Sequence, residues 1–168
     1  MDGGARRGRR GRTEEEPLMM EITIREASEG DAAAVARLSG QLGYPLGLAT
    51  ARERLDALAH GGRDAIFVAT TGDGQVAGWV HVYGAQHLVT EPFAEVGGLI
   101  VDETCRGQGI GPRLLTRAED WAREHAYARL RVRSNAARTR AHEFYRRHAY
   151  ELRKTQAVFE LVLQPGVD

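Results

Sequence analysis

The sequence predicts a single α/β domain of the α+β kind, with a mixed, mostly antiparallel sheet of about six or seven strands flanked by four helices. Segments in which apolar and polar residues alternate, as in strands, are interleaved with segments in which apolar residues recur every three or four positions, as in helices. Short turns join successive strand-like segments, which favours antiparallel neighbours. With 168 residues, 42% of them hydrophobic, the chain is long enough for one core.

The first 18 residues are predicted to be a disordered tail, and the domain is predicted to span residues 19–168. The tail holds five arginines followed by three glutamates and almost no apolar residue, so burial cannot offset the entropy of ordering it. A nucleic-acid or membrane-surface arm is an alternative, although the glutamates compete for the arginines. A third interpretation is that translation starts at Met19 or Met20, directly before the first strand.

The first half of the chain is predicted to form a strand, two helices and a hairpin. Residues 21–26 alternate as in a half-buried strand. Asp31 is placed to cap a first helix, and Thr50 with Glu53 has the capping-box spacing that opens a second. Residues 65–84 read as two strands joined by the turn TGDG.

The second half alternates between strands and helices. Residues 93–101 form an apolar strand, and from Ile110 apolar residues recur at helical spacing as far as His125. A strand at 129–134 and a helix at 137–148 follow. The remaining segments, ELRKT and AVFELVL, are predicted to form a hairpin.

Composition and charge exclude several classes of function. The apolar runs are far shorter than the roughly 20 residues that span a bilayer, and no secretory signal is apparent, so a cytoplasmic protein with no membrane partner is expected. The lone Cys105 and the six histidines show no metal-ligand spacing, so we expect neither a disulfide framework nor a metal. A net charge of zero argues against nucleic acid as the main partner.

The clearest motif is RGQGIG, residues 106–111, between the strand at 93–101 and the helix after it. Glycine accepts positive φ and lets another group approach the main chain closely. A loop of this kind directs N–H groups to one point beside the positive end of the helix dipole, which is typical of phosphate binding. A tight turn without a ligand is the alternative. Because Pro112 follows Gly111, neither a Walker A loop nor a dinucleotide fingerprint fits.

In its Arg-x-x-Gly-x-Gly pattern this loop resembles the GNAT superfamily of acetyl-CoA-dependent N-acyltransferases. The order of elements from about residue 21 to residue 163 is similar to that fold, as is the segment SNAARTRAHEFYRRHAYE (134–151) with its Asn and Phe-Tyr pair. The resemblance implies acetyl transfer from acetyl-CoA to a primary amine, of a small molecule rather than a protein. A non-catalytic acyl-CoA sensor and a peptide N-acetyltransferase are alternatives, and dimers are common in the family.

The resemblance also implies how the coenzyme binds. Its pyrophosphate is expected at the backbone amides from Gln108 to Gly111, with Arg106 adding a cation. Its pantetheine arm is expected along the main chain at 99–101, where a strand amide polarises the thioester carbonyl, and near Asn135. The cofactor-binding residues implied are Leu99, Ile100, Val101, Arg106, Gly107, Gln108, Gly109, Ile110, Gly111, Asn135 and Tyr145.

Two positions depart from the family pattern. Pro112 has no N–H and so removes one phosphate donor, although proline is well tolerated in the first turn of a helix. Ala149 stands where the family usually has glycine before the final aromatic residue. If that position requires positive φ, alanine there costs about 1 kcal/mol.

Amine acetylation needs a base for the amine and an acid for the departing thiolate. Similarity to family members predicts Glu95 as the base and Tyr145 as the acid. A solvent-facing or arginine-paired Glu95 and a buried structural Tyr145 are the alternatives, and Glu103 is a weaker candidate base. His81 and His87 are either proton relays on the acceptor side or ordinary strand and loop residues.

Overall fold

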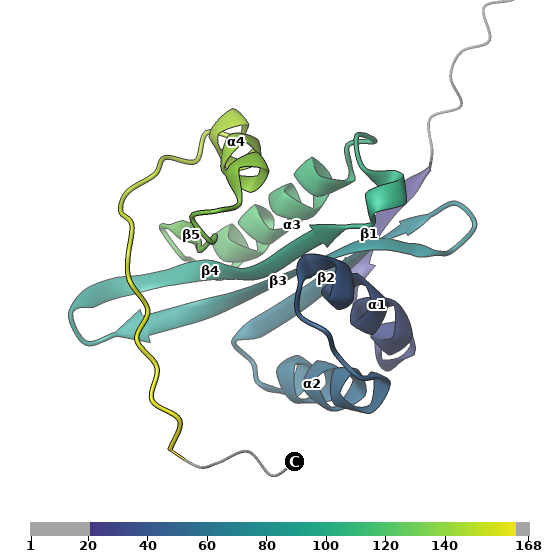
Figure 1. Ribbon diagram of the computed structural model, residues 1–168, viewed down its shortest axis with the longest axis horizontal. Helices are drawn as coiled ribbons and strands as arrows, with labels where there is room; N and C mark the ends of the chain where they lie inside the picture. Colours follow the sequence, from purple (N-terminus) through teal and green to yellow (C-terminus); the bar gives the residue numbers. More distant parts are fainter. Residues whose placement is uncertain (1–20, 164–168) are drawn as a thin grey trace, which may run out of the picture.

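The computed structural model describes residues 21–163, so the expected N-terminal tail lies outside the described residues. Figure 1 shows one sheet with helices on both of its faces. The elements in chain order are β1 (Ile22–Glu26), η1 (Glu29–Asp31), α1 (Ala32–Leu42), α2 (Leu48–His60), β2 (Asp64–Thr71), β3 (Val76–His87), β4 (Thr90–Val101), η2 (Glu103–Cys105), α3 (Ile110–Glu124), β5 (Leu130–Val132) and α4 (Thr139–Arg147).

The sheet has the order β1-β2-β3-β4-β5. The first four strands are antiparallel to their neighbours, whereas β4 and β5 are parallel. The predicted fold class is therefore confirmed, with five strands in the described residues in place of the six or seven expected. Both hairpins follow from short turns between alternating segments, and the parallel pair requires the crossover helix α3.

Alternate residues of β3 enter two different cores. Val80 and Val82 are fully buried in the larger core, against the apolar stripe of α3. Trp79 lies on the opposite face, where it packs on the smaller core formed by α1 and α2. This two-residue alternation is what lets one sheet carry helices on both faces.

The predicted C-terminal hairpin is wrong for this structure. Residues 151–163 form no strand and are exposed; Val158 and Phe159 are 92% and 94% exposed. In the view of Figure 1 the segment leaves α4 and crosses the ribbons of the β3–β4 hairpin. Apolar residues alone do not make a strand, which also needs an edge to pair with.

The start of α2 also differs from the prediction. The helix begins at Leu48 with Gly47 as its N-cap, so Thr50 and Glu53 lie inside the helix and form no capping box at its start. Asp31 does occupy the N-cap position of α1. Its carboxylate accepts hydrogen bonds from Arg25 and from the Ser28 N–H, which hold the pKa of Asp31 below its usual range.

Two further findings concern the described residues alone. None of their helices is long and apolar enough to cross a membrane. Nor do residues 21–163 contain a group of three or more His, Cys, Asp or Glu side chains that could hold a metal ion.

Candidate active site

The outer edge of β4 is paired along only part of its length. Ala94, Glu95 and Val96 are paired with β5. From Gly97 to Val101 the described part of the chain offers this edge no strand partner, although the other edge stays paired with β3. The strands β4 and β5 therefore separate after Val96 and leave a row of main-chain groups at an open edge.

The direction of the amides along this open edge follows from one hydrogen bond. The Asp102 N–H donates to the Ala77 carbonyl beyond the inner edge. Because successive strand amides point to opposite edges, the Ile100 amide also points to β3, and those of Leu99 and Val101 point to the open edge. Of the three strand residues predicted to bind coenzyme, two present a donor there.

A β-bulge marks the point where the edge opens. Val82 is opposite Val96 and His81 is opposite Gly98, so Gly97 has no partner on β3. Bulges re-aim neighbouring groups and are frequent next to active sites. Here the extra residue shifts the alternation by one position, which turns the Leu99 amide outward.

The glycine loop has the backbone conformation expected of a phosphate cradle. Gly107 and Gly109 have φ of 80° and 77°, values that L side chains rarely adopt. The Arg113 N–H donates to the Gly109 carbonyl as α3 begins, so the preceding N–H groups, up to Gly111, have no helical acceptor in the described chain. Pro112 adds no donor.

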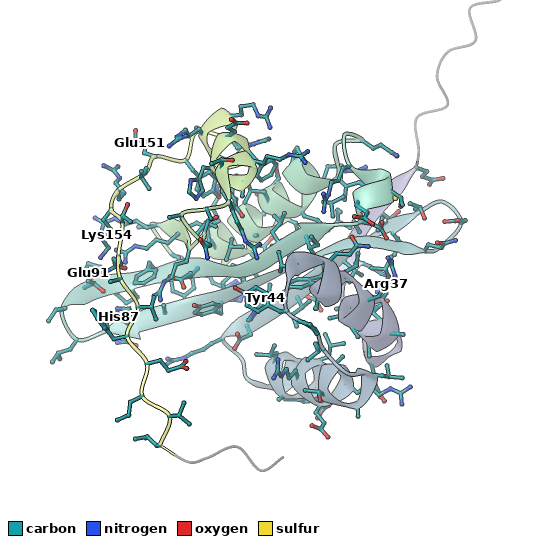
Figure 2. All side chains as sticks on the ribbon, viewed as in Figure 1. Arg37, Tyr44, His87, Glu91, Glu151 and Lys154 are labelled. Carbon is teal, nitrogen blue, oxygen red and sulfur yellow. The ribbon has the colours of Figure 1, made fainter. Side chains whose placement is uncertain are left out.

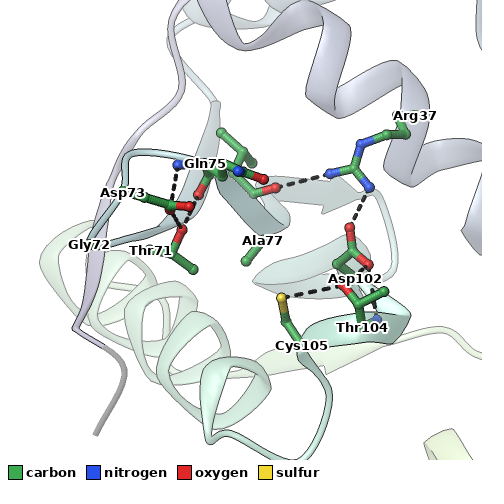
Figure 3. A pocket seen from close by; sticks show the side chains of 10 residues that line it. Arg37, Thr71, Gly72, Asp73, Gln75, Ala77, Asp102, Thr104 and Cys105 are labelled. Carbon is green, nitrogen blue, oxygen red and sulfur yellow. Dashed lines mark hydrogen bonds and ion pairs between the residues drawn. The ribbon is translucent and has the colours of Figure 1, made fainter. Parts of the chain in front are cut away.

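The loop is held in place at the end of β4. The Asp102 carboxylate pairs with Arg37 of α1 and accepts hydrogen bonds from the N–H and hydroxyl of Thr104 (Figure 3). The Arg37 bond, ahead of the Thr104 amide, keeps the pKa of Asp102 well below its usual range. These groups and Cys105 line a cavity of about 260 Å³ at the β2–β3 turn. The anchor fixes how the chain enters the cradle.

Arg106 and Asn135 have partners within their own loops. The exposed Arg106 donates through Nε to the Val101 carbonyl at 3.3 Å, which leaves the end of its guanidinium free to move. The side-chain oxygen of Asn135 accepts from the Ala137 N–H at 2.9 Å, as in a local turn. The predicted pantetheine contact of Asn135 therefore depends on its amide nitrogen.

Helix α4 covers the start of α3. A Cβ on Gly111 would lie 3.3 Å from the Phe144 ring, so glycine is what allows this approach. Tyr145 meets Phe144 edge-on, and burial raises the pKa of Tyr145 above its ordinary value. The nearby Tyr150 hydroxyl donates to Glu119 at 3.0 Å.

The other predicted catalytic residue, Glu95, is buried on the sheet face that carries α1 and α2. Its carboxylate accepts a 2.5 Å hydrogen bond from the Tyr83 hydroxyl and pairs with Arg133 Nε at 3.0 Å. Burial, then the bond to Glu95, raises the pKa of Tyr83 to about 12. Of the two environments that the sequence allowed for Glu95, the structure places it beside an arginine.

The sequence missed two contributions to this face. Arg138 donates to the Leu42 carbonyl at 2.7 Å and stacks 5.9 Å from the Tyr44 ring centre, which joins the end of α1 to the loop before α4. Figure 2 shows Tyr44 at the end of α1. On the same face, His81 pairs with Asp64 at 2.8 Å. Asp64 is the diagonal neighbour of His81 in the register of the β2–β3 hairpin. Because this register follows from the turn between the two strands, the pair could have been predicted from the sequence.

A sheet that opens beside a glycine cradle defines the class of acyl-CoA-dependent acyltransferases. Residues 27–150 match the model of the acetyltransferase (GNAT) family. The chain belongs to this family and is an acyltransferase.

Solved structures show the same fold. An aminoglycoside 6′-N-acetyltransferase from Acinetobacter baumannii has a TM-score of 0.76 and 18% identity, over 86% of this chain and 100% of that one. A transcriptional regulator from Bacillus halodurans C-125 has a TM-score of 0.75 and 21% identity, over 84% and 100%. An aminoglycoside N-acetyltransferase in complex with CoA gives 0.77 and 15%, over 89% and 99%. No curated protein matches the chain.

Proposed function

We propose that this protein transfers an acetyl group from acetyl-CoA to a primary amine of a small molecule. The observation that carries the proposal is the continuity of two rows of main-chain donors. The outward amides of Leu99 and Val101 lead along β4 to Asp102, and the cradle from Gln108 to Gly111 begins six residues later. Acetyl-CoA fits such a path, because a long pantetheine chain joins its thioester to a diphosphate.

The residues present fit the coenzyme in charge as well as in shape. The cradle amides lie at the positive end of α3 and suit a diphosphate. The exposed side chain of Arg106 adds a cation at the entrance. The Leu99 amide, at the opening of the edge, would donate to the acetyl carbonyl oxygen, where negative charge develops during attack.

Tyr145 is proposed as the acid that protonates the departing sulfur. Its raised pKa, caused by burial, keeps the proton on the phenol at neutral pH. The ring packs at the edge of the larger core with Phe144, which contacts the first turn of α3. A donor held this way is fixed beside the cradle helix.

Similarity to the family proposes Glu95 as the base, but the partners of its carboxylate leave an amine no direct access to it. It lies on the same strand as the open edge, two residues before the bulge, and its carboxylate is 4% exposed. Arg133 pairs with this carboxylate, and both carboxylate oxygens already accept hydrogen bonds. An amine would reach it through water or after displacement of one of these partners.

A small acceptor is supported by the structural neighbours and by the site itself. Two of the neighbours are named as aminoglycoside acetyltransferases. Tyr44 after α1 and Glu91 at the far end of the β3–β4 hairpin (Figure 2) are proposed to contact the acceptor. The Arg138 bond to Leu42 joins the loop before α4 to the end of α1.

The proposal is tested by thiol release from acetyl-CoA in the presence of separate panels of aminoglycosides, polyamines, amino acids and peptides. We expect turnover with at least one small amine and none without an amine. Tight acetyl-CoA binding without turnover in any panel would instead indicate a sensor. Turnover confined to peptides would exclude the small-molecule acceptor.

A further inference from the structure

His81 and Asp64 form a hydrogen-bonded pair on the sheet face that carries α1 and α2. His81 Nε2 lies 2.8 Å from Asp64 Oδ1, and the two side chains are 22% and 21% exposed. The pair comes from two adjacent strands, β2 and β3, so its geometry is set by the rigid sheet. Such rigidity is typical of groups that must hold one orientation.

The hydrogen bond determines which nitrogen of His81 is available. An ionised carboxylate only accepts, so in the neutral imidazole the Nε2 nitrogen carries the hydrogen that it donates to Asp64. The lone pair then lies on Nδ1. A carboxylate that orients an imidazole in this way prepares the opposite nitrogen to accept a proton.

Nδ1 faces the bulge at which the β4 edge opens. A Cβ on Gly97 would lie 2.8 Å from this nitrogen and 3.2 Å from the Tyr83 ring, so only glycine leaves space there. On Gly98 a Cβ would collide with the Trp79 ring at 2.8 Å. The glycines therefore bring the imidazole against β4 within two residues of the outward Leu99 amide.

Glu95 is less accessible than His81 on this face. The glutamate carboxylate is 4% exposed and is occupied by Tyr83 and Arg133, whereas the His81 side chain is 22% exposed and has one nitrogen uncommitted. The Tyr83 phenol, which donates to Glu95, keeps its proton at neutral pH because burial and the neighbouring carboxylate raise its pKa to about 12.

We infer that His81, oriented by Asp64, accepts the proton from the attacking amine in the proposed acetyl transfer. His81 Nδ1 takes one proton from the ammonium group and passes it to solvent. The freed nitrogen bonds to the acetyl carbon, and the carbon–sulfur bond breaks. Tyr145 gives its proton to the sulfur and regains one from the acylated nitrogen, so that the products are an amide, the free thiol and one proton.

The charged and titratable groups around His81 come from three strands and the loop after β5. They are Asp64 on β2, Tyr83 on β3, Glu95 on β4 and, beyond Glu95, Arg133. Asp64 is hydrogen-bonded to the imidazole, and Arg133 is paired with Glu95. Because the proposed base acts as the neutral imidazole, the rate should rise with pH.

The test is the pH dependence of kcat/KM for the amine found by the thiol-release assay. His81→Gln should lower kcat about 100-fold, in the range of general-base contributions, and should abolish the acidic limb of the profile. Its affinity for acetyl-CoA should stay within about twofold of the wild type. Retention of the acidic limb with kcat within about threefold of the wild type would overturn the inference.

Asp64 is tested as a positioning residue. Asp64→Asn should lower kcat about tenfold, because the carboxylate no longer fixes the orientation of the imidazole. Asp64→Glu should restore part of the rate. An Asp64→Asn rate within about twofold of the wild type, or no rescue by Asp64→Glu, would contradict this role.

The chain contains a matched control in the exposed pair of His60 and Asp56 on α2, whose atoms are 3.3 Å apart. His60→Gln and Asp56→Asn should leave both rate and profile unchanged. Circular dichroism and acetyl-CoA titration identify any variant that fails to fold. The inference depends on the proposed function, so the absence of turnover in the wild type would overturn both. A normal wild type with an unaffected His81→Gln would overturn the inference alone.

Discussion

Strand β4 consists of two regions that differ in their backbone pairing. Ala94–Val96 is paired with strands on both sides, whereas Gly98–Val101 is paired with β3 alone and Gly97 with neither strand. Both regions hold buried apolar side chains such as Val96 and Ile100. The difference between them therefore lies in the main chain.

In the proposed function, this difference in main-chain pairing is what makes one region of β4 a binding edge. In the first region the backbone groups are satisfied within the sheet and serve stability. In the second region the outward amides of Leu99 and Val101 need a partner from solvent or from a ligand. The boundary between the two regions is set by the bulge at Gly97 and by the end of the pairing with β5.

The largest effect is expected at the cradle that follows the open region. Gly109→Val should weaken acetyl-CoA binding at least about 100-fold, or about 2.7 kcal/mol, because a β-branched residue at φ 77° must change the backbone that presents the amides. Isothermal titration calorimetry on the folded variant measures this change.

A matched control is available at the β2–β3 turn. Gly74 has φ of 83°, and a Cβ there would meet nothing within 4 Å, as is also the case at Gly109. Gly74→Val should therefore lower the free energy of unfolding about as much as Gly109→Val does. Unlike Gly109→Val, it should leave the affinity for acetyl-CoA unchanged. If Gly109→Val and Gly74→Val bound acetyl-CoA with equal affinity, the glycine loop at 106–111 would be a tight turn without a ligand.

A smaller effect is expected where α4 covers the start of α3. Tyr145→Phe should lower kcat at least tenfold, about 1.4 kcal/mol, because the sulfur loses its proton donor, while acetyl-CoA affinity stays nearly unchanged. Tyr150→Phe is the control, since this hydroxyl is bound to Glu119. If Tyr145→Phe turned over at the wild-type rate with saturating substrates, the tyrosine would be structural.

The backbone conformation of the glycine loop could be predicted from the sequence because it requires particular residues. Positive φ at Gly107 and Gly109 is rare for other residues, so the glycines themselves report the geometry. The hairpins were predictable for the same reason, since their turns and alternation are local. The sequence thus predicts best what neighbouring residues determine together.

Long-range partners set the features that the sequence left open. The pairing of Glu95 with Arg133 depends on β5 lying parallel to β4, and residue spacing contains no measure of that. The segment 157–163 is almost entirely apolar, as in a strand, but no local pattern states which edge it would join. His81 was left as either relay or ordinary residue because its close approach to Gly97, which gives it room, depends on the bulge in β4.

The smallest effect is expected at Ala149, and it separates backbone conformation from function. This residue has φ of 65° at the end of α4, so Ala149→Gly should raise the free energy of unfolding by about 1 kcal/mol and leave kcat unchanged. Ala57→Gly, inside α2, should lower it by a similar amount because glycine weakens a helix interior. Urea unfolding measures both.

Gly109 and Ala149 share the left-handed conformation, but only at Gly109 do the adjoining amides face a proposed ligand site. A loss of acetyl-CoA affinity in Ala149→Gly would therefore show that the end of α4 belongs to the site, and would remove the distinction between the open region of β4 and its supports.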